Sequence, residues 1–509
     1  MNVRDLMRQA VTTNRRRTAV VHDARRITFG EAWDRATRFA NGLLALGLQP
    51  GDRVGVLEDN SFESVDIIAG CAIANLVRVP LYARNAVDIH AHMLANTQCR
   101  ALVASDRYAA EAAALGDVVE HVLVRDAGYE GWLAAQSAIE PDIRIEPQDW
   151  YIIRHTGGTT GRPKAVAYSH RSWLSACRDW FYIFPQVVAG DSCLHCGPIS
   201  HASGYQFLPV WFAGGCNVLI DHFEPELVLD LIEHERIGYF QAVAAMLRAM
   251  IDFPGSAARD FSSLKCVLVG AAPVSDRTAL EARALLGDVL YQGYGETEVL
   301  PIAFMGPQQW FAEVEGSAPL RACGMVMPFS RVEIWDEENR PLPLGEIGEI
   351  VAQSDGMMSQ FWNDPEASAE RMVDGWIKTG DIGRIDINGY VYLIDRAADT
   401  IISGGYNIYP GEIERVIAND PRVTEVAVFG VPHARWGESP MALCVLAAGA
   451  EMAERDVIDL VARELGGYQK PSRVEFSRAP LPRSAVGKIN RKQLREPYWQ
   501  GAGRRVAGS

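Results

Sequence analysis

The chain has 509 residues, of which 48% are hydrophobic and 22% are charged, a balance that is ordinary for a globular protein with a large core. At roughly 100–200 residues per domain, this length predicts two to four structural units. The formal net charge of −15 disfavours a nucleic-acid partner, because the phosphates would be repelled.

The first residues lack the apolar segment of a secretory signal. The most apolar stretch, 65–81, contains Asp66 and Arg78, so no membrane span is expected. Nine cysteines are scattered along the chain. Cys193 and Cys196 have the spacing of half a metal site, but no second Cys/His pair follows at zinc-site spacing, which favours buried free thiols. We therefore expect a reducing, cytoplasmic compartment.

Helix-like and strand-like segments alternate through the first part of the chain. Thr28 is a plausible helix N-cap, and helical apolar spacing continues through Phe39 to Leu44. Strands are expected at 54–57, 77–81, 101–104, 150–154 and 264–270. Strands that alternate with helices predict an α/β fold with parallel strands.

The composition changes near residue 396, and the roughly 100 residues that follow are enough for a core of their own. We expect a strand at 425–430 and helices at 411–417 and around 456–465 in this part, which also contains the apolar stretch 400–403. The chain is therefore divided into residues 1–396 and a small α+β unit of residues 397–509.

Residues 156–164 read Thr-Gly-Gly-Thr-Thr-Gly-Arg-Pro-Lys and directly follow an expected strand. Glycines let backbone N–H groups approach an anion, the hydroxyls add donors, and the lysine adds positive charge, so the loop predicts a polyphosphate site. A flexible surface turn is the alternative. The spacing differs from a Walker loop, so a P-loop fold is not implied. The candidate phosphate-binding residues are Thr156, Gly157, Gly158, Thr159, Thr160, Gly161 and Lys164.

Two later motifs carry further groups suited to a nucleotide. Residues 293–298 read Gly-Tyr-Gly-Glu-Thr-Glu after an apolar stretch, which places them at a strand end. Tyr294 offers a face for stacking, and Glu298 offers a hard oxygen ligand for Mg²⁺, although a turn with a solvated glutamate is the alternative. Residues 376–381 end in Asp381, whose carboxylate can accept both hydroxyls of a ribose.

Two more motifs complete a series of five. Residues 395–410 include Ser-Gly-Gly-Tyr-Asn-Ile-Tyr-Pro, and residues 481–491 read Leu-Pro-Arg-Ser-Ala-Val-Gly-Lys-Ile-Asn-Arg. In this order and at these distances, the five motifs resemble the adenylate-forming superfamily of acyl-CoA synthetases, peptide-synthetase adenylation domains and firefly luciferase. Acyl- and aryl-CoA synthetases are closest in appearance, and the resemblance covers nearly the whole chain.

The resemblance implies an α/β fold with two domains. A large N-terminal α/β domain with parallel sheets and a distorted barrel would be followed by a small mobile α+β C-terminal domain, with the active site between them. ATP and a carboxylate would give an acyl-adenylate and pyrophosphate, and the thiol of CoA would then displace AMP. The implied cofactors are ATP, Mg²⁺ and CoA.

The resemblance also assigns roles to individual positions. Lys488 matches the lysine that bridges carboxylate and phosphate, Thr297 an α-phosphate contact, and His201 the border of the carboxylate and acyl pocket. Thr160 and Glu298 match the metal contacts. The further cofactor-binding candidates are Gly270, Ala271, Ala272, Tyr294, Gly295, Asp381 and Arg396 for the nucleotide side, and Ser403, Gly404, Gly405 and Tyr406 for the pantetheine channel.

The sequence departs from the family pattern at two positions. Gly157 stands where the family commonly has Ser, which removes one hydroxyl donor. Ala398 stands at the hinge position that is usually Asp or Lys, which leaves open how two domain orientations are balanced.

The segment around His201 favours a plain carboxylic acid over an amino acid. Amino-acid-activating relatives carry an Asp here to pair with the α-amine, and none lies between Cys193 and Tyr205. A packed core histidine is the alternative for His201. The other expected pocket walls are small and apolar, with a few bulky residues, and lie at 241–246, 270–273, 293 and 299–302. They suit an aliphatic or aryl acid.

CoA is the favoured acceptor, because residues 403–410 are close to the form seen in acyl- and aryl-CoA synthetases. A carrier protein, whose phosphopantetheine would use the same channel, is the alternative. A catalytically silent adenylate-binding protein is a remote third, which the presence of all five motifs disfavours. No nucleic-acid partner and no membrane span are expected.

Overall fold

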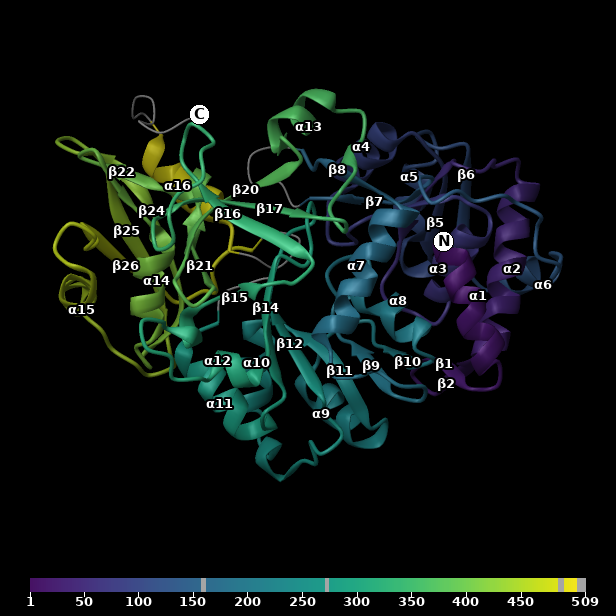
Figure 1. The fold of residues 1–509 in the computed structure, drawn as a ribbon, viewed down its shortest axis with the longest axis horizontal. Helices are drawn as coiled ribbons and strands as arrows, with labels where there is room; N and C mark the ends of the chain where they lie inside the picture. Colours follow the sequence, from purple (N-terminus) through teal and green to yellow (C-terminus); the bar gives the residue numbers. More distant parts are fainter. Residues whose placement is uncertain (157–161, 271–273, 484–488, 501–509) are drawn as a thin grey trace.

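Three β-sheets, of 14, seven and five strands, organise the part of the chain that the computed structural model describes, residues 1–156, 162–270, 274–483 and 489–500. The two larger sheets and most helices form an N-terminal body. The five-stranded sheet and its helices form a smaller C-terminal unit beside it (Figure 1).

The seven-stranded sheet is parallel through its middle. Its strands in spatial order are β18 (Gln360–Phe361), β8 (Ala165–Ser169), β7 (Trp150–His155), β4 (Val77–Pro80), β3 (Arg53–Leu57), β5 (Cys99–Ser105) and β6 (His121–Arg125). The five strands from β7 to β6 are parallel, whereas β8 and β18 pair antiparallel at one edge. The carboxyl end of β7 therefore leads directly into the predicted phosphate loop.

The 14-stranded sheet changes character along its width. Its parallel half consists of β1 (Thr18–His22), β10 (Cys216–Leu219), β9 (Ser192–His195), β11 (Ile237–Ala242), β12 (Cys266–Gly270) and β13 (Leu290–Tyr294), with β2 (Arg25–Thr28) antiparallel at the edge. The other half continues antiparallel from β13 through β14 (Ala303–Met305), β15 (Gly324–Val326), β21 (Tyr390–Arg396), β20 (Trp376–Ile385), β17 (Gly348–Ser354) and β16 (Ser330–Trp335), and β19 (Met372–Val373) pairs with β20.

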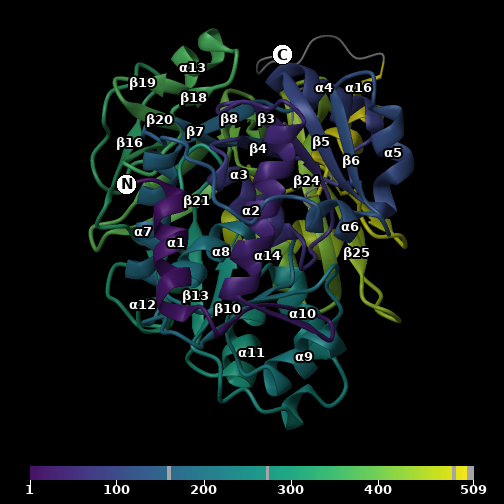
Figure 2. The ribbon, with the colours of Figure 1, turned by 90° about the vertical axis from the view of Figure 1, so that its right-hand side faces the viewer.

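Helices fill three layers around the two large sheets. The central layer is packed in one apolar core with strands of both sheets and contains α1 (Val3–Asn14), α2 (Phe29–Ala45), α3 (Ser64–Ile73), α7 (His170–Ile183) and α8 (Gly204–Phe212). The outer face of the larger sheet is covered by α9 (Pro225–His234), α10 (Ala244–Asp252) and α11 (Asp276–Leu286), with the short α12 (Pro307–Trp310) nearby. The outer face of the smaller sheet is covered by α4 (Val87–Thr97) and α5 (Ala109–Ala114), which Figure 2 shows beside β5 and β6. The short α6 (Tyr129–Ala134) packs on α2, and α13 (Pro365–Arg371) lies next to β18 and β20.

The sequence predictions for this body are confirmed where they rest on local patterns. The helix expected after Thr28 is α2, and the Thr28 and Glu31 side chains form a reciprocal capping box at its start. All five expected strands form. The pattern missed the antiparallel half of the large sheet, because the strands after residue 300 are joined mostly by turns rather than by crossover helices.

The C-terminal unit has its own sheet and its own apolar core. Its strands are β22 (Ile401–Ser403), β23 (Tyr406–Ile408), β24 (Val423–His433), β25 (Gly437–Leu446) and β26 (Arg473–Ser477), and its helices are α14 (Pro410–Ala418), α15 (Glu454–Leu465) and α16 (Arg491–Trp499). The α/β fold with a large and a small unit is thus confirmed. The boundary at residues 396 and 397 stays a prediction, and the second sheet starts at Ile401.

The cysteines and the helices agree with two further expectations from the sequence. All nine cysteines are buried and free, including Cys193 and Cys196, as the sequence predicted. Within the described ranges, none of the helices combines the length and the apolar character that crossing a membrane would require.

Gly70 permits the closest approach of α2 and α3, and this contact gives a stability prediction. A Cβ at Gly70 would lie 2.6 Å from Phe39 Cδ1 and 2.9 Å from the backbone oxygen of Ala36. Gly70→Ala is therefore expected to lower the free energy of unfolding by about 1–3 kcal/mol through overpacking. At Gly131 in α6 a Cβ would meet nothing within 4 Å, so Gly131→Ala should be neutral or stabilising by up to ~1 kcal/mol. Urea denaturation of both variants measures the contrast, and equal effects would contradict the packing argument.

Candidate active site

Three predicted nucleotide-binding residues, distant in sequence, meet in one cluster around the buried Asp381. Tyr294 lies at the end of β13, and its hydroxyl donates a hydrogen bond of 2.6 Å to Oδ2 of Asp381 on β20. Arg396 lies directly opposite Asp381 in the β20–β21 ladder, and its Nε is 2.6 Å from Asp381 Oδ1. Asp381 is only 1% exposed. The structure therefore brings together the stacking, ribose and second nucleotide positions that the sequence predicted.

Two charged residues that the sequence analysis missed complete this cluster. Arg371, the last residue of α13, donates from Nη2 to Oε1 of Glu296 (2.8 Å) and to the carbonyl of Thr379 (2.9 Å), and it lies 3.8 Å from Oε1 of Glu298. Burial, followed by the charge of Glu298, raises the pKa of Glu296 well above its ordinary range. Glu296 lies within the motif 293–298, but the sequence indicated no function for it. Arg371 stands outside all five motifs, and no sequence signal marked it.

The segment that carries Thr297 and Glu298 is fixed through its backbone. The Tyr168 hydroxyl donates to the carbonyl of Thr297 (2.5 Å), and the N–H of Met358 donates to the carbonyl of Glu298 (2.7 Å). The Glu298 side chain is free of these backbone contacts, although the residue is buried. These two backbone hydrogen bonds fix the position from which the Glu298 carboxylate approaches Arg371.

The chemistry of this cluster fits Mg²⁺ only together with a nucleotide. Among the described residues, no group of three or more His, Cys, Asp or Glu side chains could hold a metal ion by itself. Mg²⁺ in nucleotide enzymes is commonly held by one or two carboxylates together with substrate phosphates and water, which a single buried Glu298 would satisfy. The second predicted metal contact, Thr160, lies outside the described residues.

The base of the predicted phosphate loop is closed by the backbone. The N–H of Thr156 donates to the carbonyl of Lys164 (2.9 Å), which continues the pairing of β7 with β8. Nζ of Lys164 lies 5.2 Å from the centre of the Phe361 ring. The predicted residues Gly157, Gly158, Thr159, Thr160 and Gly161 lie outside the described residues, so their role stays a prediction.

His201 lies in a turn that rests on buried aromatic and basic groups. The ring of Tyr82 packs edge-on against His201 with centroids 5.2 Å apart, and the Tyr82 hydroxyl donates to the carbonyl of His155. Beneath the turn, Arg154 is 2% exposed and donates to the carbonyl of Ser200 (3.0 Å). Its guanidinium carbon lies 4.2 Å from the centre of the Tyr205 ring. A buried positive charge thus underlies the turn, which is favourable for a site that binds an anion.

Glycines bring the neighbouring strand ends close together. A Cβ on Gly270, the last residue of β12, would lie 2.8 Å from the carbonyl oxygen of Gly293 on β13. A Cβ on Gly295 would lie 2.3 Å from Leu300 Cδ1. These glycines therefore permit the turn that presents Thr297 and Glu298. The predicted residues Ala271 and Ala272 lie outside the described residues.

The predicted pantetheine loop is the tight turn between β22 and β23, flanked by Ser403 and Tyr406. Gly404 and Gly405 have φ of 59° and 86°, which side-chain-bearing residues rarely adopt. A Cβ on Gly404 would lie 2.7 Å from Trp436, whereas one on Gly405 would meet nothing within 4 Å. Backbone conformation and contact with Trp436 therefore account for the glycines, and their role in a channel stays a prediction.

The hinge expected near Ala398 is a short 3₁₀ turn, Ala397–Asp399, between β21 and β22. On one side of it, Asp395 accepts hydrogen bonds from the N–H of Arg396 and from the N–H of Gly411 on α14, both at 2.7 Å. On the other side, Asp399 lies 3.5 Å from Arg491. Arg491 follows the segment of Lys488, which itself lies outside the described residues. Ala398 thus has a charged neighbour, Asp399, whose side chain is paired with Arg491.

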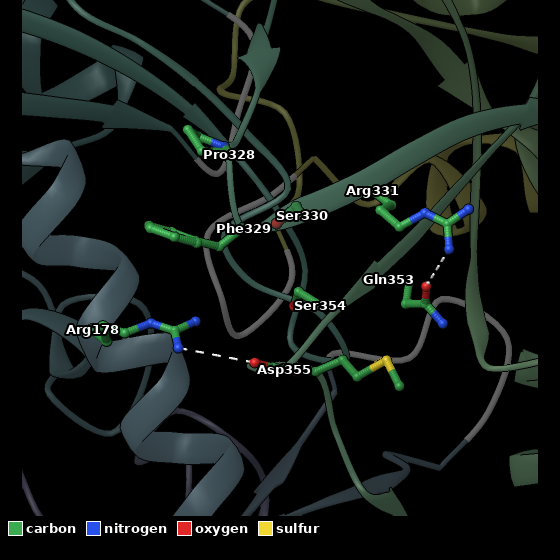
Figure 3. Close-up of a pocket in the computed structure, with 9 residues that line it drawn as sticks. Arg178, Pro328, Phe329, Ser330, Arg331, Gln353, Ser354 and Asp355 are labelled. Carbon is green, nitrogen blue, oxygen red and sulfur yellow. Dashed lines mark hydrogen bonds and ion pairs between the residues drawn. The ribbon is translucent and has the colours of Figure 1, made fainter.

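A separate hollow of about 440 Å³ lies behind the segment that follows Glu298. Figure 3 shows Arg178 from α7 facing Asp355 at 3.9 Å, with Phe329 above them. The Ser330 hydroxyl joins this hollow to the predicted acid-pocket wall through a 2.9 Å hydrogen bond to the carbonyl of Pro301. None of the predicted nucleotide residues lines it, so the charge cluster around Asp381 is the better candidate for the chemistry.

Comparison with known proteins gives the same family over both parts of the chain. Residues 7–362 match the family described as AMP-binding enzyme, and residues 412–488 match the AMP-binding enzyme C-terminal domain. A feruloyl-CoA synthase from Amycolatopsis sp is 35% identical over 484 residues, covering 94% of this chain and 96% of that protein. A fatty acid–[acyl-carrier-protein] ligase, ScoC of Streptomyces coeruleorubidus, is 33% identical over 505 residues, covering 96% of this chain and 95% of that protein.

Among solved structures, ATP-bound MatB from Rhodopseudomonas palustris superposes with a TM-score of 0.89 at 28% identity, covering 98% of this chain and 99% of that one. The chain therefore belongs to the AMP-binding enzyme family, and it is an AMP-forming ligase. The resemblance seen in the five motifs is confirmed.

The junction at Asp395 gives a prediction about pH. Burial raises the pKa of Asp395 from its ordinary value of 3.8 to about 7. Because the folded protein favours the protonated carboxyl, the stabilisation is complete below about pH 4 and is lost as the pH rises through 7. Asparagine does not titrate, so the melting temperature of Asp395→Asn minus that of the wild type should increase from pH 5.5 to 8. Scanning calorimetry measures it, with the exposed Asp117→Asn as control, and a difference independent of pH would contradict the assignment.

Proposed function

We propose that this enzyme activates a carboxylic acid with ATP, forming an acyl-adenylate and pyrophosphate, and then transfers the acyl group to the thiol of CoA with release of AMP. The observation that carries the proposal is the cluster of Tyr294 and Arg396 around the buried Asp381, beside Glu298. It combines an aromatic face, a ribose acceptor, a cation and a metal-binding carboxylate in one place.

The first half-reaction joins two anions, so positive groups must hold charge as it moves onto pyrophosphate. In the proposal, Thr156 to Lys164 bind the triphosphate, Thr297 contacts the α-phosphate, and Asp381 and Arg396 bind the ribose side of the nucleotide. Glu298 and Thr160 would hold Mg²⁺, which would supply further positive charge to the phosphates. Lys488 bridges carboxylate and α-phosphate, where its charge stabilises the transition state more than the ground state.

The second half-reaction uses the same acyl site with a thiol. AMP is a good leaving group, so the thiol attacks the acyl carbon and the bond to the phosphate oxygen breaks. Residues 403–406 of the unit 397–509 are proposed to line the pantetheine path, after that unit turns relative to residues 1–396. The hinge at Ala397–Asp399, between two separate sheets, supports such a motion.

The acid is proposed to be a plain aliphatic or aryl carboxylic acid that binds next to His201. The buried guanidinium of Arg154 below that turn supports an anionic carboxylate, and no acidic residue stands between Cys193 and Tyr205 to receive an α-ammonium. Relatives named for ferulate and for fatty acids support both classes. The nine free cysteines support a reducing, cytoplasmic setting.

A carrier-protein phosphopantetheine is the second candidate acceptor. It is supported by the similarity to ScoC, which is named for an acyl-carrier-protein acceptor. The pantetheine path would be the same in both cases, so the two acceptors differ only in what the protein surface binds.

We expect AMP release to require ATP, Mg²⁺, an acid and CoA together. The test is a coupled assay with octanoate, palmitate, benzoate, cinnamate and ferulate, run with CoA, with a holo acyl-carrier protein, or with neither. Turnover only with the carrier protein would select the second candidate. Absence of ATP–pyrophosphate exchange with every acid would instead favour the catalytically silent alternative.

Lys488→Ala is expected to separate the two half-reactions. Loss of the side-chain charge should lower acyl-adenylate formation by at least 10²-fold, an order of magnitude typical for one electrostatic contact. Thioester formation from a supplied acyl-adenylate and CoA should change less than about threefold. Pyrophosphate exchange and single-turnover thioester formation measure the two steps, and equal losses would show that Lys488 does not act in adenylation alone.

A further inference from the structure

The charge cluster around Asp381 contains two residues, Glu296 and Arg371, that the proposed reaction does not use. Their side chains are 8% and 22% exposed. Burying a carboxylate is costly unless cations and hydrogen bonds compensate it. This cost needs a reason, because the position between Gly295 and Thr297 does not itself require an acidic residue for the turn.

The geometry links Glu296 to the ribose-binding pair. Its Oε1 accepts the 2.8 Å hydrogen bond from Arg371, and its Oε2 faces Nη1 of Arg396 at 4.0 Å. Arg396 in turn holds Asp381 through the 2.6 Å contact of its Nε. A continuous row of paired groups therefore runs from Arg371 through Glu296 and Arg396 to Asp381. Burial raises the pKa of Glu296, and the two guanidinium charges of this row oppose that rise.

Within this row, Arg396 is held between two carboxylates. Asp381 fixes its Nε side, and Glu296 attracts its Nη1 side. Arg371 fixes Glu296 in turn, and its second bond, to the carbonyl of Thr379, ties it to β20 two residues before Asp381. Arg371 therefore locates both carboxylates relative to each other.

If Glu296 and Arg371 served only to join α13 to β20, fewer contacts would suffice. The bond from Arg371 to the Thr379 carbonyl would alone join α13 to β20. Beyond that bond, the carboxylate of Glu296 lies against the two arginines, one of which is a predicted nucleotide contact. The carboxyl group of Glu296 thus faces the nucleotide side of the cluster.

We propose that Glu296 and Arg371 form a positioning pair that holds Arg396 and Asp381 in the geometry that receives the ribose of the nucleotide. This inference rests on the proposed function, because it assumes that Asp381 and Arg396 bind an adenine nucleotide. The pair does not touch the reacting atoms. It acts through Arg396, whose guanidinium would otherwise be free to rotate away from Asp381.

The test is the binding of AMP, without metal, to the full chain by isothermal titration calorimetry. Glu296→Gln and Arg371→Gln should each weaken AMP binding by about tenfold. Since both break the same row of paired groups, the double variant should bind AMP within twofold of the weaker single variant. Lys378→Gln is the matched control. Lys378 lies on β20, as Asp381 does, and forms a salt bridge of 3.1 Å with Glu349 on β17 that is separate from the row. Its removal should leave AMP binding within twofold of the wild type.

The outcomes separate this inference from its alternatives. Unchanged AMP affinity in both single variants, with or without a lower melting temperature, would leave only a structural role and overturn the proposal. Losses that multiply in the double variant would show that the two residues act independently, which also contradicts a pair. If a Gln variant fails to fold, Glu296→Asp and Arg371→Lys replace it, because they keep the ionisable groups. These variants should weaken AMP binding less than tenfold. Complete loss of AMP binding in folded Glu296→Asp or Arg371→Lys protein would contradict the electrostatic role. Failure of the wild type itself to bind AMP would refute the proposed function as well.

Discussion

The contact between Asp381 and Arg396 is the interaction on which the site depends. It forms because β20 and β21 pair in a register that sets these two residues directly opposite each other. A carboxylate that is 1% exposed must be compensated, and the guanidinium and the Tyr294 hydroxyl do so from two other segments. A slip of one residue in the ladder would put Asp381 and Arg396 on opposite faces of the sheet and so separate them.

The same register places the proposed nucleotide site next to the joint between the two units. Arg396 is the last residue of β21, and its neighbour Asp395 accepts the N–H of Gly411 from the C-terminal unit. A proposed ligand contact and a contact with the second unit therefore stand next to each other on one strand end.

The features that depend on short-range sequence patterns could be predicted from the sequence. The helix cap at Thr28 and the β7 strand follow from short-range patterns, and the grouping of Tyr294, Asp381 and Arg396 followed from resemblance. Arg371 could not be found this way, because an arginine at the end of a helix looks like any solvated charge until β20 is folded beside it. Gly404 and Gly405 were assigned to the pantetheine channel from the resemblance, and their positive φ, a requirement of the turn itself, could not be read from the sequence.

The described residues on either side of positions 484–488 make several contacts within the C-terminal unit. Arg483 pairs with Ile489 in an isolated β-bridge and contacts Glu425, while Arg491 donates to Glu414 (2.9 Å). Arg491 also lies 3.5 Å from Asp399 of the hinge turn. Arg491 thereby ties the start of α16 both to α14 and to the turn between β21 and β22. Because Asp399 lies in that turn, a change in the turn's conformation would have to preserve this contact or break it.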